Sequence, residues 1–172
     1  MKKIVLGAIL SLLFVITNAQ EFPKLDKSPH DIATYKTSRN EPTLAKVVYG
    51  RPQLKGRTMI GDKIPYGKIW RTGANEATEI TFFQDVTFGG KAVKAGTYSL
   101  FTIPNEKEWT IILNSDLNTW GAYSYDEKKD VVRFNVPVQH VDKVLEAFSM
   151  DFEKENLFMG WDTIRIAIPI QF

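Results

Sequence analysis

The clearest periodic pattern in the chain is Trp161-Asp162-Thr163-Ile164-Arg165-Ile166-Ala167-Ile168-Pro169-Ile170. Its four isoleucines occupy alternate positions. Because successive side chains of a strand point to opposite faces, these isoleucines share one face of an extended segment. A strand with one apolar face is half-buried, so this stretch predicts a sheet that packs against a core.

Shorter runs rich in apolar and β-branched residues recur along the chain between turn residues. The segments expected to be strands are 32–37, 43–49, 78–84, 86–88, 91–94, 97–103, 108–114, 131–138 and the run from Phe148 onward. Residues 141–147 also fit one or two helical turns. About eight to ten short strands without a long helix predict an all-β antiparallel sandwich, jelly-roll-like or immunoglobulin-like, with a barrel as the alternative.

The N-terminus has the pattern of a secretory signal peptide. Lys2 and Lys3 precede an apolar run at 4–16, and small residues follow at 17–19. The run is shorter than the roughly 20 residues that span a bilayer. We therefore expect an exported, soluble protein, periplasmic or extracellular, without a transmembrane segment after signal removal. The expected division is 1–19 signal peptide, 20–30 N-terminal arm and 31–172 single sandwich domain.

Composition argues against several classes of function. The chain has no cysteine, so we expect no disulfide, no thiol chemistry and no lipoprotein anchor. Signal removal leaves 22 − 2 = 20 basic residues against 20 acidic ones, and this balance argues against a nucleic-acid partner. The histidines lie far apart, at His30 and His140. Residues 114–125 have Thr119 and Tyr125 at the positions where a calcium loop needs Gly and Glu. No metal and no cofactor are expected.

Two polar stretches are candidates for a site. Residues 50–76 contain many Gly and Pro residues, and a loop longer than about 12–15 residues is often functional. The end of this region, residues 69–78, crowds large, charged, small and amide side chains together without a helical or strand period. A second polar loop, 115–130, contains Trp120 and Tyr123.

Several blocks of these regions together resemble a known family. They are Tyr49-Gly50-Arg51-Pro52, Lys55-Gly56-Arg57, Pro65-Tyr66-Gly67, Ile69-Trp70-Arg71-Thr72-Gly73-Ala74-Asn75-Glu76-Ala77-Thr78, Ala95-Gly96-Thr97-Tyr98-Ser99-Leu100-Phe101 and Trp120-Gly121-Ala122-Tyr123. The blocks are similar to those of the exported bacterial family called domain of unknown function 2911. The resemblance covers nearly all of the mature chain. It implies an exported β-rich domain and brings no established activity, substrate or catalytic residue.

The first functional hypothesis is a non-enzymatic binding module of the cell envelope. A small polar ligand, a saccharide or a peptide, would bind between the two loops. Arginine offers a planar fork for carboxylates or sugar hydroxyls, asparagine adds an amide, and exposed aromatic rings suit sugars. The candidate ligand-binding residues are Arg51, Arg57, Trp70, Arg71, Asn75, Glu76, Trp120 and Tyr123.

Two alternatives remain open. One is a hydrolase centred on Glu76, with Asp116 or Asp126 as the second carboxylate, because glycoside hydrolysis uses two acids about 5–10 Å apart. The other is a structural or assembly domain whose partner is an envelope protein. In that case Arg71 and Glu76 pair with each other as a brace. Trp109 and Trp161 lie in strand patterns and are expected in the core, each with a partner for its indole N–H.

Overall fold

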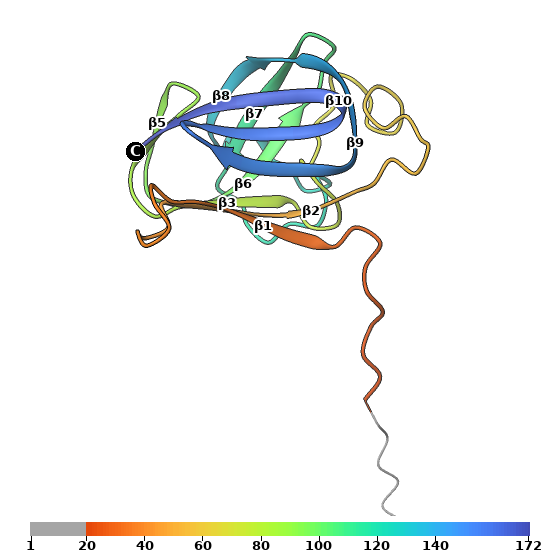
Figure 1. The fold of residues 1–172 in the computed structure, drawn as a ribbon, viewed down its shortest axis with the longest axis horizontal. Helices are drawn as coiled ribbons and strands as arrows, with labels where there is room; N and C mark the ends of the chain where they lie inside the picture. Colours follow the sequence, from red (N-terminus) through yellow and green to blue (C-terminus); the bar gives the residue numbers. More distant parts are fainter. Residues whose placement is uncertain (1–19) are drawn as a thin grey trace, which may run out of the picture.

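The computed structural model describes residues 20–172, so the predicted signal peptide, 1–19, lies outside the described residues. Two antiparallel sheets face each other (Figure 1). The six-stranded sheet has the order β1-β2-β3-β6-β7-β8. Its strands are β1 (His30–Tyr35), β2 (Ala45–Gly50), β3 (Thr78–Phe82), β6 (Gly96–Ile103), β7 (Glu108–Asn114) and β8 (Asp130–Pro137).

The second sheet has four strands in the order β5-β4-β10-β9. They are β5 (Lys91–Val93), β4 (Val86–Phe88), β10 (Asn156–Gln171) and β9 (Gln139–Glu153), and one short 3-10 turn, η1 (Glu127–Lys129), precedes β8. The arrangement is sandwich-like, with ten strands in two separate sheets. This confirms the all-β antiparallel sandwich expected from the sequence. Within residues 20–172 no helix is long and apolar enough to cross a membrane.

Strand β10 confirms the alternating pattern from which the fold class was inferred. Ile166, Ile168 and Ile170 are at most 1% exposed, and Ile164 is partly buried against the same core. The strand begins at Asn156, earlier than the isoleucine pattern indicates, because residues 156–160 pair with the end of β9. The isoleucine face therefore forms one wall of the apolar interior.

The alternative of helical turns at residues 141–147 is wrong. These residues belong to the continuous 15-residue strand β9. Leu145 pairs with Asp162 and His140 with Ile164, and the register shifts twice along this part of the hairpin. Such irregularities break the regular inside-outside alternation of a strand, which explains why the local pattern was ambiguous.

A cluster of aromatic rings fills the centre of the core. Trp109 and Trp161 are each 1% exposed, which confirms the expectation that both are core residues. Trp70 joins them at 5% exposure. Its ring stacks on Trp161, with centroids 5.8 Å apart, and meets Trp109 and Phe148 edge-on. The indole N–H of Trp161 donates to the Glu146 carbonyl, whereas that of Trp109 has no acceptor among residues 20–172, contrary to expectation.

The long region 50–76 is ordered by pairing with distant strands. Gln53 forms an isolated bridge with Ala147 of β9, and Trp70 forms one with Thr102 of β6. In the second bridge the two residues exchange both backbone hydrogen bonds, at 2.7 and 2.9 Å. The region is therefore attached to both sheets. The arm before β1 leaves the body of the molecule as an extended segment (Figure 1).

Candidate functional site

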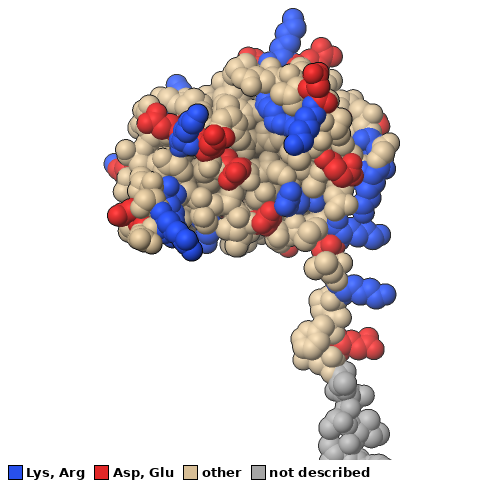
Figure 2. All heavy atoms as spheres, in the orientation of Figure 1, with Lys and Arg blue, Asp and Glu red and all other residues tan. Residues whose placement is uncertain are grey.

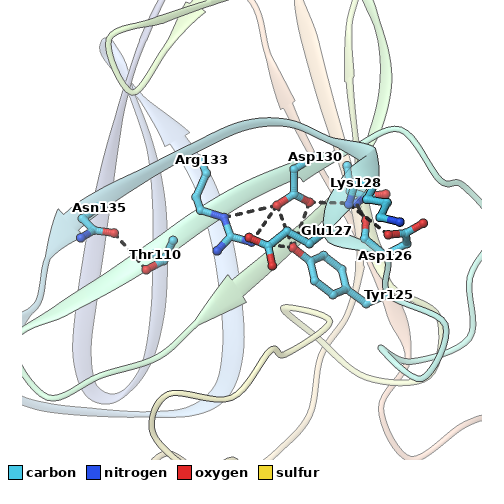
Figure 3. Close-up of polar contacts among 9 residues, drawn as sticks. Thr110, Tyr125, Asp126, Glu127, Lys128, Asp130, Arg133 and Asn135 are labelled. Atoms are coloured by element: carbon cyan, nitrogen blue, oxygen red, sulfur yellow. Dashed lines mark hydrogen bonds and ion pairs between the residues drawn. The ribbon is translucent and has the colours of Figure 1, made fainter.

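The second loop, residues 115–130, is held by a polar network around the Asp130 carboxylate (Figure 3). Tyr125 Oη donates to both carboxylate oxygens, at 2.9 and 2.8 Å. Arg133 Nη2 donates to the same carboxylate at 2.8 Å and pairs with Glu127 at 3.2 Å. Asn114, at the end of β7, donates its side-chain amide to Asp130 Oδ1 at 2.9 Å. The end of the loop is thus fixed to β7 and β8.

Burial and the adjacent Asp130 carboxylate raise the pKa of Tyr125 from the usual 10.0 to about 12. Ionisation would place a phenolate against a carboxylate in a partly desolvated site. Because the folded pKa lies above the unfolded one, the neutral phenol stabilises the fold below pH 10. That contribution is lost as the pH rises from 10 through about 12.

We expect the Tyr125 phenol to be the late step in an alkaline titration. The measurement is the difference in tyrosinate absorbance between the wild-type protein and Tyr125→Phe. Its midpoint should lie near pH 12. Tyr49, whose pKa is also raised by burial, is present in both proteins and cancels in the difference. A difference midpoint at the ordinary value of 10 would contradict the network.

The two polar loops meet through their backbones. Gly121 N donates to Asn75 O at 3.0 Å, and Ala77 N donates to Thr119 O at 2.9 Å, on either side of a bridge between Glu76 and Trp120. Asn75 adopts a left-handed conformation, with φ +63°. Asparagine tolerates this region better than most residues. The conformation turns the chain so that Asn75 O reaches the second loop.

A cavity of about 380 Å³ opens where the two loops meet. Residues 50–73 provide most of its wall, the second loop contributes two residues and β10 one. The lining comprises Pro52, Met59, Lys63, Ile64, Pro65, Lys68, Ile69, Trp70, Arg71, Gly73, Ala122, Tyr123 and Trp161. Most of these side chains are apolar or aromatic, and every charged one is a cation.

Arg71 is the half-buried cation of this cavity. Its Nε is buried and has no hydrogen-bond partner in the part of the chain that the structure describes. Burial lowers the pKa of Arg71, and Tyr123 has a smaller opposite effect. Because the guanidinium forms no ion pair with a residue of the range 20–172, the protein itself leaves its positive charge uncompensated.

Comparison with models of known protein families identifies the family of this chain. A model of the family described as "Protein of unknown function (DUF2911)" matches residues 28–170. The chain belongs to this family. The DUF2911 match includes both sheets and both polar loops, and the resemblance seen in the sequence is confirmed. No curated protein and no solved structure gives a significant match.

Three of the eight candidate residues, Trp70, Arg71 and Tyr123, line this cavity of the DUF2911 domain. We call it the main cavity because both polar loops contribute to it, although a hollow of about 480 Å³ at Arg57 is larger. Trp70 does so from within the core, whereas Tyr123 is 88% exposed. Trp120 is 61% exposed and does not line the cavity, although its backbone is bridged to the first loop. Asn75 contributes through its backbone carbonyl at the junction of the loops.

Glu76 faces a different hollow. It lines a smaller cavity of about 270 Å³ with His30, Val48, Ala77, Glu79 and Asn118. Its Oε2 lies 3.2 Å from His30 Nε2. The Arg71–Glu76 pair of the structural alternative is therefore not formed, because each of the two side chains belongs to its own cavity.

The other two arginines of the first loop lie outside the main cavity. Arg51 donates to Asp31 Oδ2 at 2.8 Å, to Ser149 Oγ at 2.7 Å and to the Phe148 carbonyl at 3.1 Å. It thereby fastens β1 to β9. Arg57 donates to the carbonyls of Gln53 and Leu54, within its own loop, and lines a separate hollow of about 480 Å³. In this structure both guanidinium groups are engaged with the protein itself.

The acids of the hydrolase alternative are also engaged elsewhere. Asp116 pairs with Lys129 at 3.0 Å, and Asp126 accepts from Lys128 N as the cap of η1. Neither lines the Glu76 cavity, where Glu79 is the second carboxylate and accepts from Asn118 N. Within residues 20–172 no group of three or more His, Asp or Glu side chains is placed to hold a metal ion.

Sequence reasoning missed several residues that line the main cavity of the DUF2911 domain. Met59, Ile64 and Pro65 form apolar wall, and Lys63 and Lys68 add charge. All five fall inside the long loop that the sequence singled out as a site. The available signal was therefore the loop itself, since no spacing of charged or apolar residues within it indicates which side chains face inward.

Proposed function

We propose that the chain is a non-enzymatic, exported binding module of the cell envelope. In this proposal a small polar ligand, a saccharide or a peptide, occupies the cavity at Arg71. The observation that carries the proposal is the meeting of two distant loops around about 380 Å³ of space. Ligand sites in proteins are usually preformed cavities of about 300–1,000 Å³ with a few polar groups in a largely apolar lining.

The composition of the lining supports binding over catalysis. Tyr123 offers an exposed ring at the cavity, and Arg71 offers a hydrogen-bonding fork. The described residues that line it include no carboxylate, imidazole or Ser/Thr hydroxyl. Those are the groups that most often serve as general acid, general base or nucleophile in hydrolysis.

Export is supported by the pattern of the first nineteen residues, in which a charged start, an apolar run and small residues follow one another. An envelope protein would be the natural partner in the structural alternative, where the loops serve as a surface for assembly.

Arrays of glycans and peptides test the proposal. The chain from Gln20 onward should be retained by at least one class of array compound. Pro65→Trp, which places a large ring at an exposed position of the cavity wall, should abolish that retention. Lys91→Trp makes a similar change at an exposed position on β5, away from the cavity, and should leave retention intact.

Circular dichroism shows whether both variants keep the β fold. Retention that survives in Pro65→Trp would place the ligand elsewhere on the molecule. A folded wild-type protein that no array compound retains would contradict the binding function and favour the assembly domain.

A further inference from the structure

We infer that the ligand carries a carboxylate and that the Arg71 guanidinium binds it. This assignment rests on the proposed binding function and names the chemical class of the ligand. Two observations support it: the Arg71 side chain has no acceptor in residues 20–172, and the charged residues that line the main cavity are all cations.

The first observation is that the Arg71 side chain has no acceptor in the protein. Its Nε is buried and without a partner in residues 20–172. The terminal Nη groups are likewise absent from the hydrogen bonds and ion pairs of that range, and they are not among its buried unpartnered atoms, so they remain accessible. A half-buried guanidinium without acceptors is costly for a protein to hold, because its desolvation is not compensated.

Arg71 is unusual among the partly buried arginines of residues 20–172, because the exposed Arg39 is the other arginine without a protein partner there. Arg51 is paired with Asp31, and Arg133 with Asp130 and Glu127. Arg165 donates to three backbone carbonyls. Each of these guanidinium groups uses the protein's own oxygen atoms, whereas Arg71 leaves its donors directed to an external acceptor.

The second observation is the imbalance of charge in the lining. Lys63, Lys68 and Arg71 all line the cavity, and no Asp or Glu does. Lys63 has a loose contact with Asp62, at 3.6 Å, and the other two cations have no acidic partner in residues 20–172. On the face drawn in Figure 2 basic and acidic side chains are mixed, whereas the charged residues that line this cavity are all cations. A cavity with this charge attracts anions.

The apolar part of the lining favours a carboxylate over a phosphate. Met59, Ile64, Pro65, Ile69 and two tryptophans provide most of the remaining wall. Transfer of a doubly charged phosphate into such surroundings costs more desolvation than transfer of a carboxylate with one charge. A planar carboxylate also matches the guanidinium fork and can accept two parallel hydrogen bonds from it. The apolar wall then receives the body of the ligand.

A carboxylate in the cell envelope can come from a peptide C-terminus or from an acidic sugar. Matched pairs of probes separate these sources. The peptide pair is Ala-Ala-Phe with a free C-terminus and the same tripeptide as its C-terminal amide. The sugar pair is phenyl glucuronide and phenyl glucoside, and phenyl phosphate serves as the phosphate probe. Dissociation constants are measured by calorimetry at low salt, where charge interactions are least screened.

We expect the carboxylate member of at least one pair to bind about tenfold or more tightly than its neutral partner, because a charge-assisted hydrogen bond is gained. In Arg71→Gln this preference should fall to about threefold or less, while the affinity for the neutral partner changes little. Arg71→Lys, which keeps the charge and loses the fork, should give an intermediate preference. Arg39→Gln, at an exposed site in the β1–β2 connection, should behave as the wild type.

Four other results would contradict the carboxylate assignment, and one of them would also contradict the binding function. Equal affinity for charged and neutral members overturns the carboxylate assignment and leaves the binding function in place. A preference that persists in Arg71→Gln, or tighter binding of phenyl phosphate than of either carboxylate, also overturns it. Absence of binding for every probe at about 1 mM, in a protein that melts normally, overturns both the assignment and the binding function.

Discussion

Replacing Trp70 by Ala is expected to lower the free energy of unfolding by about 3–5 kcal/mol. The side chain is 5% exposed and packs against Trp109, Phe148 and Trp161 in the centre of the core. Deletion of the ring removes buried apolar area and leaves a cavity that the surrounding rigid rings cannot fill. For a domain of this size the melting temperature should fall by roughly 10 °C or more.

Trp120→Ala is the matched control, because it removes the same ring from a position that is 61% exposed. It should change the free energy of unfolding by no more than about 0.5 kcal/mol. Both variants are compared with the wild type by urea denaturation followed by far-ultraviolet circular dichroism, since the substitutions remove indole fluorescence. Equal losses in the two variants would mean that Trp70 does not belong to the core.

Gly50→Ala is expected to have the second large effect on stability. A Cβ atom at Gly50 would collide with the backbone carbonyl oxygen of Ala74. A Cβ atom at Gly73 would lie 3.0 Å from the backbone oxygen of Gly50, so the two ends of the long loop are in backbone contact. Because backbone atoms cannot move aside as a side chain does, we expect a loss of about 3 kcal/mol or more.

Gly56→Ala is the comparison for this substitution. A Cβ atom at Gly56 meets nothing within 4 Å, although its φ of +70° makes alanine somewhat strained. The expected loss there is about 1 kcal/mol, reduced by the smaller conformational freedom of the unfolded chain. Urea denaturation of both variants measures the difference. A Gly50→Ala protein as stable as Gly56→Ala would show that the two ends of the loop are not in close contact.

The strands were largely predictable because apolar and polar residues alternate along them, and this local pattern shows which side chains are buried. The isoleucines of β10 and the tryptophans of β7 and β10 point to the core for a reason that is visible within a few residues of each. The irregular part of β9 was not predictable in this way. Its conformation is decided by pairing with β10 across two shifts of register, and no local pattern encodes that partner.

The candidate site was predictable only as a region. Trp70 and Trp120 both lie in loops next to charged or small residues, yet one is in the core and the other is on the surface. The difference arises because Trp70 is bridged to Thr102 of β6, a partner more than thirty positions away. Arg51 and Arg71 differ for the same reason, since Asp31 and Ser149 reach the first and not the second.

Two of the four tryptophans, Trp70 and Trp161, belong at once to the aromatic core and to the wall of the main cavity. Any molecule that enters changes the surroundings of these stacked indoles directly. Their ultraviolet emission should therefore act as a built-in reporter of occupancy, without a dye or a tag. Trp120 lies at the surface outside the cavity, so its emission should stay constant when a ligand binds. Mixtures of candidate ligands can therefore be screened by the change in the protein's tryptophan emission.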